Sequence, residues 1–233
     1  IKIVRYGLRP DSGGPGKFRG GMATVMHFVS QAPNTRITAR NRDRTRFTSW
    51  GVLGGHAGAT SQFLLNPGTN HEVNLGNTDI LTIGPGDEML VACGGAGGWG
   101  NPFERDPAAV LLDVQRGFVS MDSALQDYGV VIKDGAVDEA ATTKLRASEP
   151  GKVNGAFYDY GSGRDAFEVV WTEANYAAMT ELLAELPVHW RFFVKHRVFE
   201  AIEALDDDAL KGDGSEIRTV FADVIARYPQ LQM

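Results

Sequence analysis

Glycine is unevenly distributed along this 233-residue chain, and its distribution limits what the first half can fold into. Nineteen of the 28 glycines lie within residues 1–100, between short alternating apolar runs at residues 24–29, 36–39 and 80–83. Glycine weakens helices, and short alternating runs bounded by Gly, Pro and Asn are typical of β-strands. The pattern predicts a glycine-rich, predominantly β domain over about residues 1–104.

The chain changes to a helical pattern after Gly100. Asp106 and Pro107 supply an N-cap and a first-turn proline, and Gly117 stands where a helix would end. Apolar spacing and capping residues predict further helices, and a strand is predicted at residues 130–133. These further helices are predicted over residues 120–128, 138–146, 172–186, about 190–205, and from about Ser215 onward.

The domain organisation follows from these patterns. Residues 148–165 are rich in Gly, Ser and Asp, which is typical of a linker. We therefore predict an α+β chain in three parts. The β domain of residues 1–104 is followed by a short α/β connector over residues 105–147, and then by a linker and helical tail over residues 148–233.

The composition excludes several classes of protein. Cys93 is the only cysteine, so an intrachain disulfide is excluded, and no Cys/His cluster has the spacing of a zinc site. No apolar run approaches the roughly 20 residues needed to cross a bilayer. Residues 1–50 hold ten Lys and Arg against two Asp and Glu, but aromatic residues do not alternate with them and the pI is about 5.4. We expect a cytoplasmic chain with no nucleic-acid partner, no membrane partner and no metal site.

The segment RPDSGGPGKFRGG at residues 9–21 holds the densest group of candidate binding residues. Glycine lets a backbone approach a ligand closely, and arginine forks suit carboxylates and phosphates. The segment is either an anion-binding loop or a glycine-rich turn whose arginines are salt-bridged to neighbouring subunits or segments. Its glycine spacing matches neither a Walker A loop nor a dinucleotide fingerprint. The candidate substrate or interface residues of this loop are Arg9, Asp11, Ser12, Gly13, Gly14, Gly16, Arg19, Gly20 and Gly21.

Four arginines alternate along the next basic segment, at Arg40, Arg42, Arg44 and Arg46. In an extended strand all four side chains would share one face. That face would be either a solvated strand edge that its charges protect from aggregation or an interface with acidic groups of a partner.

His56 and Cys93 are the other candidates for chemistry. His56 lies in the glycine-rich loop GGHAG and is either an acid/base or ligand residue or a structural histidine. Cys93 has no recognisable base nearby in the sequence, so we expect a buried thiol and not a nucleophile. Ser12 lacks the Gly-x-Ser-x-Gly elbow of many hydrolases. The sequence shows no catalytic triad, and the catalytic residues stay unknown.

Several ordered motifs carry a family resemblance. They are RPDSGGPGKFRGG, WGVLGGHAG, GDEMLVACGGAGGWGNPFERDPAAVLLDVQRGFVS, ALQDYGVVI and VDEAATTKLR, and they cover most of residues 5–146. In this order they resemble the C-terminal portion of the hydantoinase B/5-oxoprolinase family, to which the corresponding subunit of acetone and acetophenone carboxylases is similar. The resemblance implies part of a larger subunit that works with a hydantoinase A-type ATP-binding subunit.

The resemblance implies one of two reactions, both of which phosphorylate a substrate oxygen at the expense of ATP. We expect the hydrolysis of a cyclic amide, such as a hydantoin, 5-oxoproline or a lactam. The alternative is the ATP-dependent carboxylation of a ketone such as acetone or acetophenone. A noncatalytic assembly subunit is a third interpretation, with the arginine face and the helical tail holding a hetero-oligomer together.

The resemblance also implies where the cofactors belong. ATP and Mg²⁺ are expected on the partner subunit. Family subunits are considerably longer, and the N-terminal portion in which carboxylase relatives hold their metal ligands is absent from this sequence. We therefore expect the chain to require the remainder of the subunit as a further partner, and we expect no activity from the isolated chain.

Overall fold

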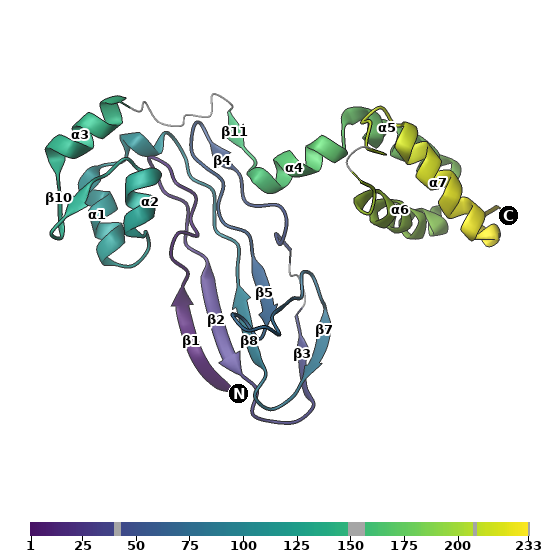
Figure 1. Ribbon diagram of the computed structural model, residues 1–233, viewed down its shortest axis with the longest axis horizontal. Helices are drawn as coiled ribbons and strands as arrows, with labels where there is room; N and C mark the ends of the chain where they lie inside the picture. The colour runs from purple at the N-terminus through teal and green to yellow at the C-terminus, as the bar shows by residue number, and fades with distance from the viewer. Residues whose placement is uncertain (40–42, 149–156, 207–208, 233) are drawn as a thin grey trace. The chain divides into compact units, whose positions relative to one another are not determined.

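The computed structural model describes residues 1–39, 43–148, 157–206 and 209–232 (Figure 1). The chain divides into two compact units, Ile1–Arg164 (unit 1) and Asp165–Met233 (unit 2). Strands predominate in the N-terminal half and helices in the C-terminal part, which confirms the predicted α+β class. The domain boundaries predicted at residues 104 and 147 stay predictions.

The largest element of unit 1 is an antiparallel five-stranded sheet in the order β1-β2-β8-β5-β6. Phe28 pairs with Met89, and Met89 pairs with Leu65 on the next strand, so apolar side chains gather on one face. The predicted strand at residues 24–29 is confirmed as β2 with the same bounds. In sheet order the strands are Lys2–Leu8, Thr24–Val29, Glu88–Ala92, Gln62–Leu65 and Val73–Asn74.

A second antiparallel ladder packs on this apolar face. It consists of β3 (Thr35–Thr38) and β7 (Ile80–Ile83). Ile83 joins one buried cluster with three side chains of the sheet, Phe28, Phe63 and Met89. Full burial of such a side chain contributes about 1.5–3 kcal/mol, which is enough to hold the short ladder in place. The strand predicted at residues 80–83 is confirmed, and the one predicted at residues 36–39 begins one residue earlier.

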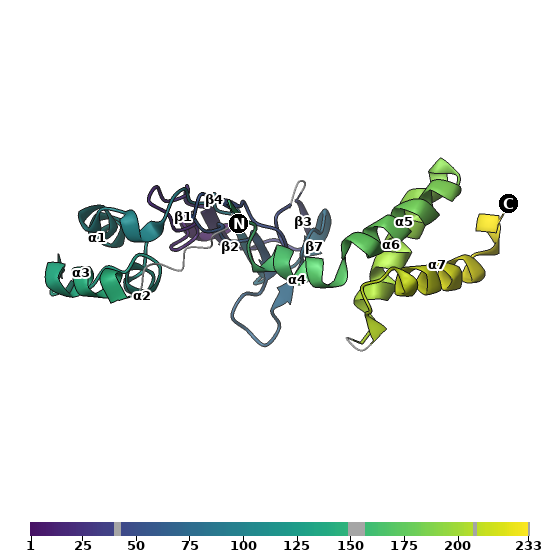
Figure 2. The ribbon, with the colours of Figure 1, turned by 90° about the horizontal axis from the view of Figure 1, so that it is seen from above.

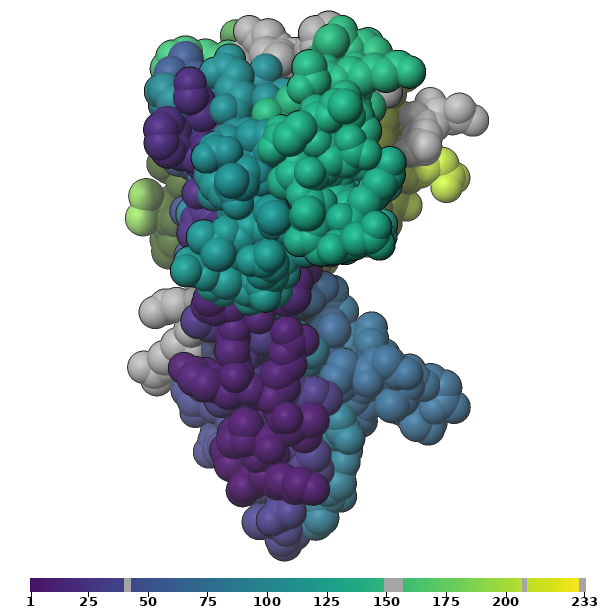
Figure 3. Space-filling view, turned by 90° about the vertical axis from the view of Figure 1, so that its left-hand side faces the viewer, coloured from purple at the N-terminus to yellow at the C-terminus, as the bar shows by residue number. Residues whose placement is uncertain are grey.

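Strand β1 forms one edge of the sheet and lies open at the surface (Figure 3). Ile3, Val4 and Tyr6 are all exposed on it. A bulge interrupts its register with β2 between Ile3 and Arg5. Within the described residues β1 is an edge strand, and its bulge and charged residues are features that disfavour pairing with a further strand.

Three glycine-rich segments, at residues 12–21, 51–59 and 94–100, lie backbone against backbone. Gly14 N donates to Ala96 O at 2.8 Å, His56 N donates to Pro15 O at 2.7 Å, and Gly98 N donates to His56 O at 2.8 Å. Only glycine fits at this spacing, which explains the high glycine content of the first half. A Cβ atom would overlap a carbonyl oxygen of a neighbouring residue at Gly14, Gly20, Gly55 and Gly95.

The α/β part of unit 1 follows the glycine-rich segments and gathers at one end of the unit (Figure 2). Asp106 caps the first helix by accepting a hydrogen bond from Ala108 N at 2.9 Å, and Gly117 follows that helix with a φ of 71°. Ser120 caps the second helix in the same way. These helices confirm the predictions, and β9 forms the second half of the predicted strand 130–133. The elements are η1 (Pro102–Glu104), α1 (Pro107–Gln115), α2 (Met121–Gln126), β9 (Ile132–Lys133), β10 (Ala136–Val137) and α3 (Glu139–Ser148).

The cap of α1 leads to a first prediction. Asp106→Ala removes the acceptor for Ala108 N, so we expect it to lower the free energy of unfolding of unit 1 by about 1 kcal/mol. Asp106→Asn keeps an oxygen acceptor at the same place and should lose much less. Urea unfolding curves of the two variants and the wild type measure both effects. An equal loss in both variants would show that the carboxylate charge, and not the cap, is responsible.

The segment predicted to be a linker contains regular structure in its described part. Residues 149–156 lie outside the described residues, and β11 (Tyr158–Asp159) and the start of α4 (Ser162–Val170) follow. Strand β11 pairs antiparallel with β4 (Gly51–Val52). This pairing depends on backbone groups of a segment far away in the sequence, which the local composition does not indicate.

Unit 2 is helical. Thr172 caps α5 by accepting a hydrogen bond from Asn175 N, and Pro187 separates α5 from α6, both as predicted. The apolar stripes of α6 and α7 meet in one core that includes Val194, Val198 and Ile217. No helix among the described residues is long and apolar enough to span a bilayer. The helices are α5 (Glu173–Glu185), α6 (Val188–Glu203), α7 (Ser215–Arg227) and η3 (Pro229–Gln232).

Candidate functional site

Ser12 and the glycines beside it form the buried part of the loop at residues 9–21. The Ser12 hydroxyl donates to Arg9 O at 2.6 Å and accepts from Ala23 N at 2.8 Å, so both of these bonds fix the turn. A Cβ atom added at Gly21 would make only an ordinary van der Waals contact. Four candidate glycines of the loop pack directly against backbone atoms, namely Gly13, Gly14, Gly16 and Gly20.

Arg9 and Asp11 bond to other segments of unit 1. Arg9 Nη1 donates to Thr60 O at 2.9 Å, and burial lowers the pKa of the Arg9 guanidinium. Asp11 Oδ1 accepts from Ser120 N at 2.8 Å, next to the start of α2. Asp11 also has a positive φ of 55°, a backbone conformation that Asp tolerates better than most residues. Both side chains thus connect the loop to its neighbours.

Arg19 belongs to an ion cluster between the loop and α1. Arg19 Nε lies 3.0 Å from Asp113 Oδ2, and Arg105 Nη2 lies 2.9 Å from the same oxygen. Asp113 exposes only 8% of its side chain. Burial raises the pKa of Tyr128 close to these residues, which keeps its phenol neutral. Arg19 is therefore bonded within the chain, as Arg9 is.

The arginines of residues 40–46 do not form the predicted one-sided strand in the part that the structure describes. Arg40 and Arg42 lie outside the described residues. Arg44 has a φ of 57°, and neither Arg44 nor Arg46 lies in a strand. A left-handed residue breaks the alternation of side chains that an extended strand requires. Arg44 Nη1 donates to Thr48 O at 3.2 Å, which closes a local turn.

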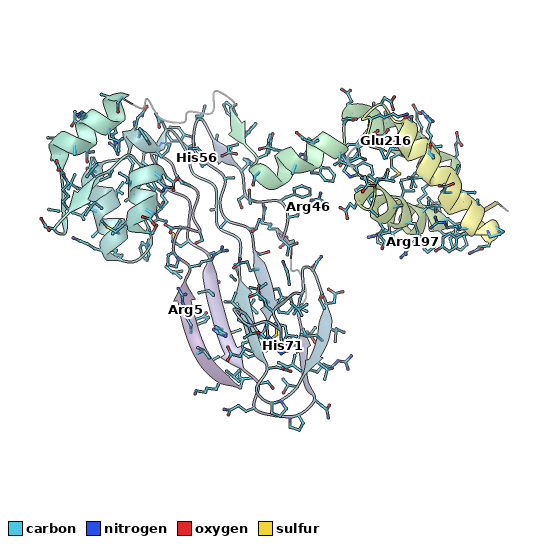
Figure 4. All side chains as sticks on the ribbon, viewed as in Figure 1. Arg5, Arg46, His56, His71, Arg197 and Glu216 are labelled. Atoms are coloured by element: carbon cyan, nitrogen blue, oxygen red, sulfur yellow. The ribbon has the colours of Figure 1, made fainter. Side chains whose placement is uncertain are left out.

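His56 lies among the glycine-rich segments next to β4, away from Arg5 on β1 and from His71 in the turn between β5 and β6 (Figure 4). Its Nδ1 is 3.3 Å from Asp159 Oδ2, and the two side chains expose 29% and 19% of their surface. The structure thus pairs the predicted His56 with a residue that the sequence did not single out. Asp159 lies more than a hundred residues away in the chain, inside the segment predicted to be a linker, and no local motif marks it.

Backbone hydrogen bonds fix both members of this pair. Asp159 Oδ2 accepts from Ala57 N at 3.0 Å, and Asp159 Oδ1 accepts from Gly161 N at 2.9 Å. His56 N donates to Pro15 O, and His56 O accepts from Gly98 N. All three glycine-rich segments and β11 therefore position the imidazole.

Exposed aromatic residues surround the β4–β11 ladder. The Trp50 and Tyr160 rings meet edge to face with centroids 6.2 Å apart, and Tyr158 lies 5.6 Å from Tyr160. On the other side of β4, Trp99 bridges to Val52 and its ring lies 5.5 Å from that of Phe18. Exposed aromatic groups of this kind are typical of surfaces that bind a partner or a ligand.

The structure also bears on the predictions made for the Cys93 thiol and for metal sites. Cys93 is half-buried and accepts a hydrogen bond from Thr24 Oγ1 at 3.3 Å, so the thiol is less buried than predicted. Within residues 1–39, 43–148, 157–206 and 209–232, no three His, Cys, Asp or Glu side chains are grouped to hold a metal ion.

Part of the sequence of unit 1 matches a known family. Residues 1–102 match the family described as hydantoinase B/oxoprolinase. The match contains the loop at residues 9–21, all three glycine-rich segments and His56. It ends before α1 and before Asp159.

Two curated relatives show how far the similarity extends. An uncharacterised protein of Methanocaldococcus jannaschii is 37% identical over 153 residues, which cover 63% of this chain and 26% of the relative. The caprolactamase subunit beta of Pseudomonas jessenii is 36% identical over 159 residues, which cover 64% of this chain and 26% of the relative. The chain thus spans about a quarter of the length of these relatives.

A solved structure shares the fold over most of the chain. A nucleotide-free acetone carboxylase structure matches with a TM-score of 0.53 and 21% sequence identity. The match covers 92% of this chain and 33% of that chain. At this level of identity the likeness concerns the fold alone.

Proposed function

We propose, from the match of residues 1–102 to the hydantoinase B/oxoprolinase family, that the chain forms part of a subunit that hydrolyses a cyclic amide at the expense of ATP. The observation that carries the proposal is the 36% identity to a caprolactamase subunit beta. Caprolactam is a cyclic amide, so the substrate class of that relative is the one proposed for this chain. The substrate is a lactam, a hydantoin or 5-oxoproline.

We place ATP on a partner subunit, as the family resemblance implies, and not on the loop at residues 9–21. Arg9 Nη1 donates to Thr60 O and Arg19 pairs with Asp113, so both arginines have partners within this chain. ATP and Mg²⁺ then belong to a hydantoinase A-type partner. The remainder of the family subunit would complete the catalytic site around the glycine-rich segments.

The ketone carboxylase is the second candidate. The acetone carboxylase alpha subunit of Xanthobacter autotrophicus is 30% identical over 186 residues, which cover 60% of this chain, whereas the caprolactamase alignment covers 64%. The hydrolase would use ATP to open a cyclic amide, and the carboxylase would use ATP to carboxylate a ketone with bicarbonate. An assay with each set of compounds therefore separates the two candidates. A noncatalytic assembly subunit is the third.

The proposal predicts which compounds stimulate ATP hydrolysis. The chain is tagged in its source, purified under native conditions and assayed with caprolactam, hydantoin, 5-oxoproline, or acetone plus bicarbonate. We expect a copurified ATP-binding subunit whose hydrolysis of ATP rises with one of the cyclic amides alone. Stimulation only by acetone with bicarbonate would replace the proposal by the carboxylase. A complex that none of these compounds stimulates would favour the assembly subunit.

A further inference from the structure

Among its described residues, unit 1 holds two histidine–carboxylate pairs, and they differ in how they are built. His27 Nε2 lies 2.7 Å from Glu88 Oε2 across the neighbouring strands β2 and β8. His56 instead meets Asp159 through Nδ1, at the junction of the glycine-rich segments with β11. Of the two pairs, only the second lies among the three glycine-rich segments and the exposed aromatic residues around the β4–β11 ladder.

The Asp159 contact assigns different roles to the two imidazole nitrogens. A carboxylate at Nδ1 favours the tautomer that carries its proton on Nδ1, and this leaves the lone pair on Nε2. No hydrogen bond or ion pair reaches Nε2 from the part of the chain that the structure describes. The ring is 29% exposed, so a reactant has access to it.

The surroundings keep this geometry fixed. Asp159 accepts two backbone hydrogen bonds, from Ala57 and Gly161, so its carboxylate holds one orientation. A Cβ atom at Gly55 would overlap Gly98 O, which shows how closely the backbone that carries His56 is packed. A fixed carboxylate beside a fixed imidazole is the arrangement that orients a proton-transferring histidine.

We propose that His56 transfers a proton through Nε2 in the hydrolysis of the amide and that Asp159 is its positioning residue. The inference rests on the proposed function. ATP first phosphorylates the amide oxygen, with release of ADP. As the oxygen of water then bonds to the amide carbon, Nε2 takes a proton from that water and passes it to the ring nitrogen. When the C–N bond breaks, the electron pair stays on the nitrogen, which takes the remaining proton of the added hydroxyl through Nε2. This leaves an acyl phosphate, and a second water displaces the phosphate. The products are the carboxylic acid, the amine and phosphate, and the imidazole ends neutral.

The aromatic residues beside the pair fit this substrate class. Tyr158 and Tyr160 flank Asp159 in the sequence and are exposed, and Trp50 meets Tyr160. The methylene groups of a lactam ring are apolar, so exposed aromatic rings provide a surface on which they lose contact with water.

The test compares the two histidine pairs in the purified complex. Turnover is measured with whichever of caprolactam, hydantoin and 5-oxoproline the wild-type complex opens. His56→Gln is expected to lower kcat about a hundredfold or more with an unchanged KM. Asp159→Asn should lower kcat about tenfold or more, because the imidazole remains but its tautomer is no longer held. His27→Gln, the matched control, should leave kcat unchanged.

Two further readouts separate a proton-transfer role from a structural one. Each variant complex is checked for assembly by size-exclusion chromatography and for its melting temperature. Added imidazole should restore part of the turnover of His56→Ala and should not change the turnover of His27→Gln. A His56→Gln complex with wild-type kcat would overturn the inference. Loss of assembly or of folding in His56→Gln would do so as well, because it would make His56 a structural residue.

Failure of the inference is distinguishable from failure of the proposed function. An active wild-type complex whose His56→Gln variant is equally active contradicts only the inference. A wild-type complex that opens none of the three amides contradicts the proposed function, and the inference falls with it.

Discussion

Gly95→Ala is expected to lower the free energy of unfolding of unit 1 by more than about 3 kcal/mol, because overpacking against a fixed backbone ranks among the most destabilising changes. The new Cβ atom would overlap the carbonyl oxygen of Ser12. That carbonyl accepts a hydrogen bond from Ala59 N at 2.9 Å, and Gly95 N donates to Ala59 O at 2.9 Å. The neighbouring atoms are backbone, so no side-chain rotation relieves the overlap.

Gly7→Ala is the matched control for this prediction. Gly7 lies in β1, and a Cβ atom there would meet no heavy atom within 4 Å. Thermal and urea unfolding of both variants measure the difference, with circular dichroism to show whether Gly95→Ala folds at all. Similar stabilities of Gly95→Ala and Gly7→Ala would contradict the backbone packing of the glycine-rich segments.

Asp113→Ala is expected to destabilise unit 1 by about 3–5 kcal/mol, the usual cost of leaving a buried charge without its partner. Asp113 lies within 3.0 Å of both Arg19 and Arg105, and all three side chains are largely buried. Its removal leaves two guanidinium groups facing each other without a counter-charge. The loop at residues 9–21 would then lose its attachment to α1.

Glu104→Gln provides the comparison for that variant. Lys17 and Glu104 form an ion pair at 3.1 Å whose side chains are 44% and 58% exposed, so its loss should cost at most about 1 kcal/mol. Urea unfolding in one buffer gives both values. A stability of Asp113→Ala within about 1 kcal/mol of the wild type would show that the buried cluster does not hold the loop.

Local signals in the sequence were sufficient for many elements. The cap, proline and terminating glycine around α1 predict that helix because each acts within a few residues of it. The same holds for the cap of α5 at Thr172. Strands β2 and β7 were predicted with their exact bounds because alternation and flanking turns are also local. The fold class followed from these elements.

The features that the sequence did not predict depend on contacts between distant segments. Strand β11 forms because β4 lies beside it, and neither is marked by its own composition. The pairing of His56 with Asp159 depends on that ladder, so it could not be predicted from the sequence either. The prediction of a one-sided arginine strand was wrong for a different reason, since the alternation of arginines does not reveal the positive φ of Arg44.

The candidate site was predicted in part. His56 and the loop at residues 9–21 were singled out from glycine and charge patterns, and the structure brings the loop backbone and His56 together through the Pro15 hydrogen bond. The loop arginines, however, bond to groups of this chain, which spacing alone left open. Their role as substrate or interface residues stays a prediction.

The central claim is that the chain works in the ATP-dependent opening of a cyclic amide. The most direct measurement is mass spectrometry of the reaction products when the native complex is incubated with ATP and with caprolactam, hydantoin or 5-oxoproline. We predict a ring-opened acid from one of the three, formed together with ADP and not formed without ATP. If no amide is opened and acetone with bicarbonate yields a carboxylated product instead, the claim is contradicted.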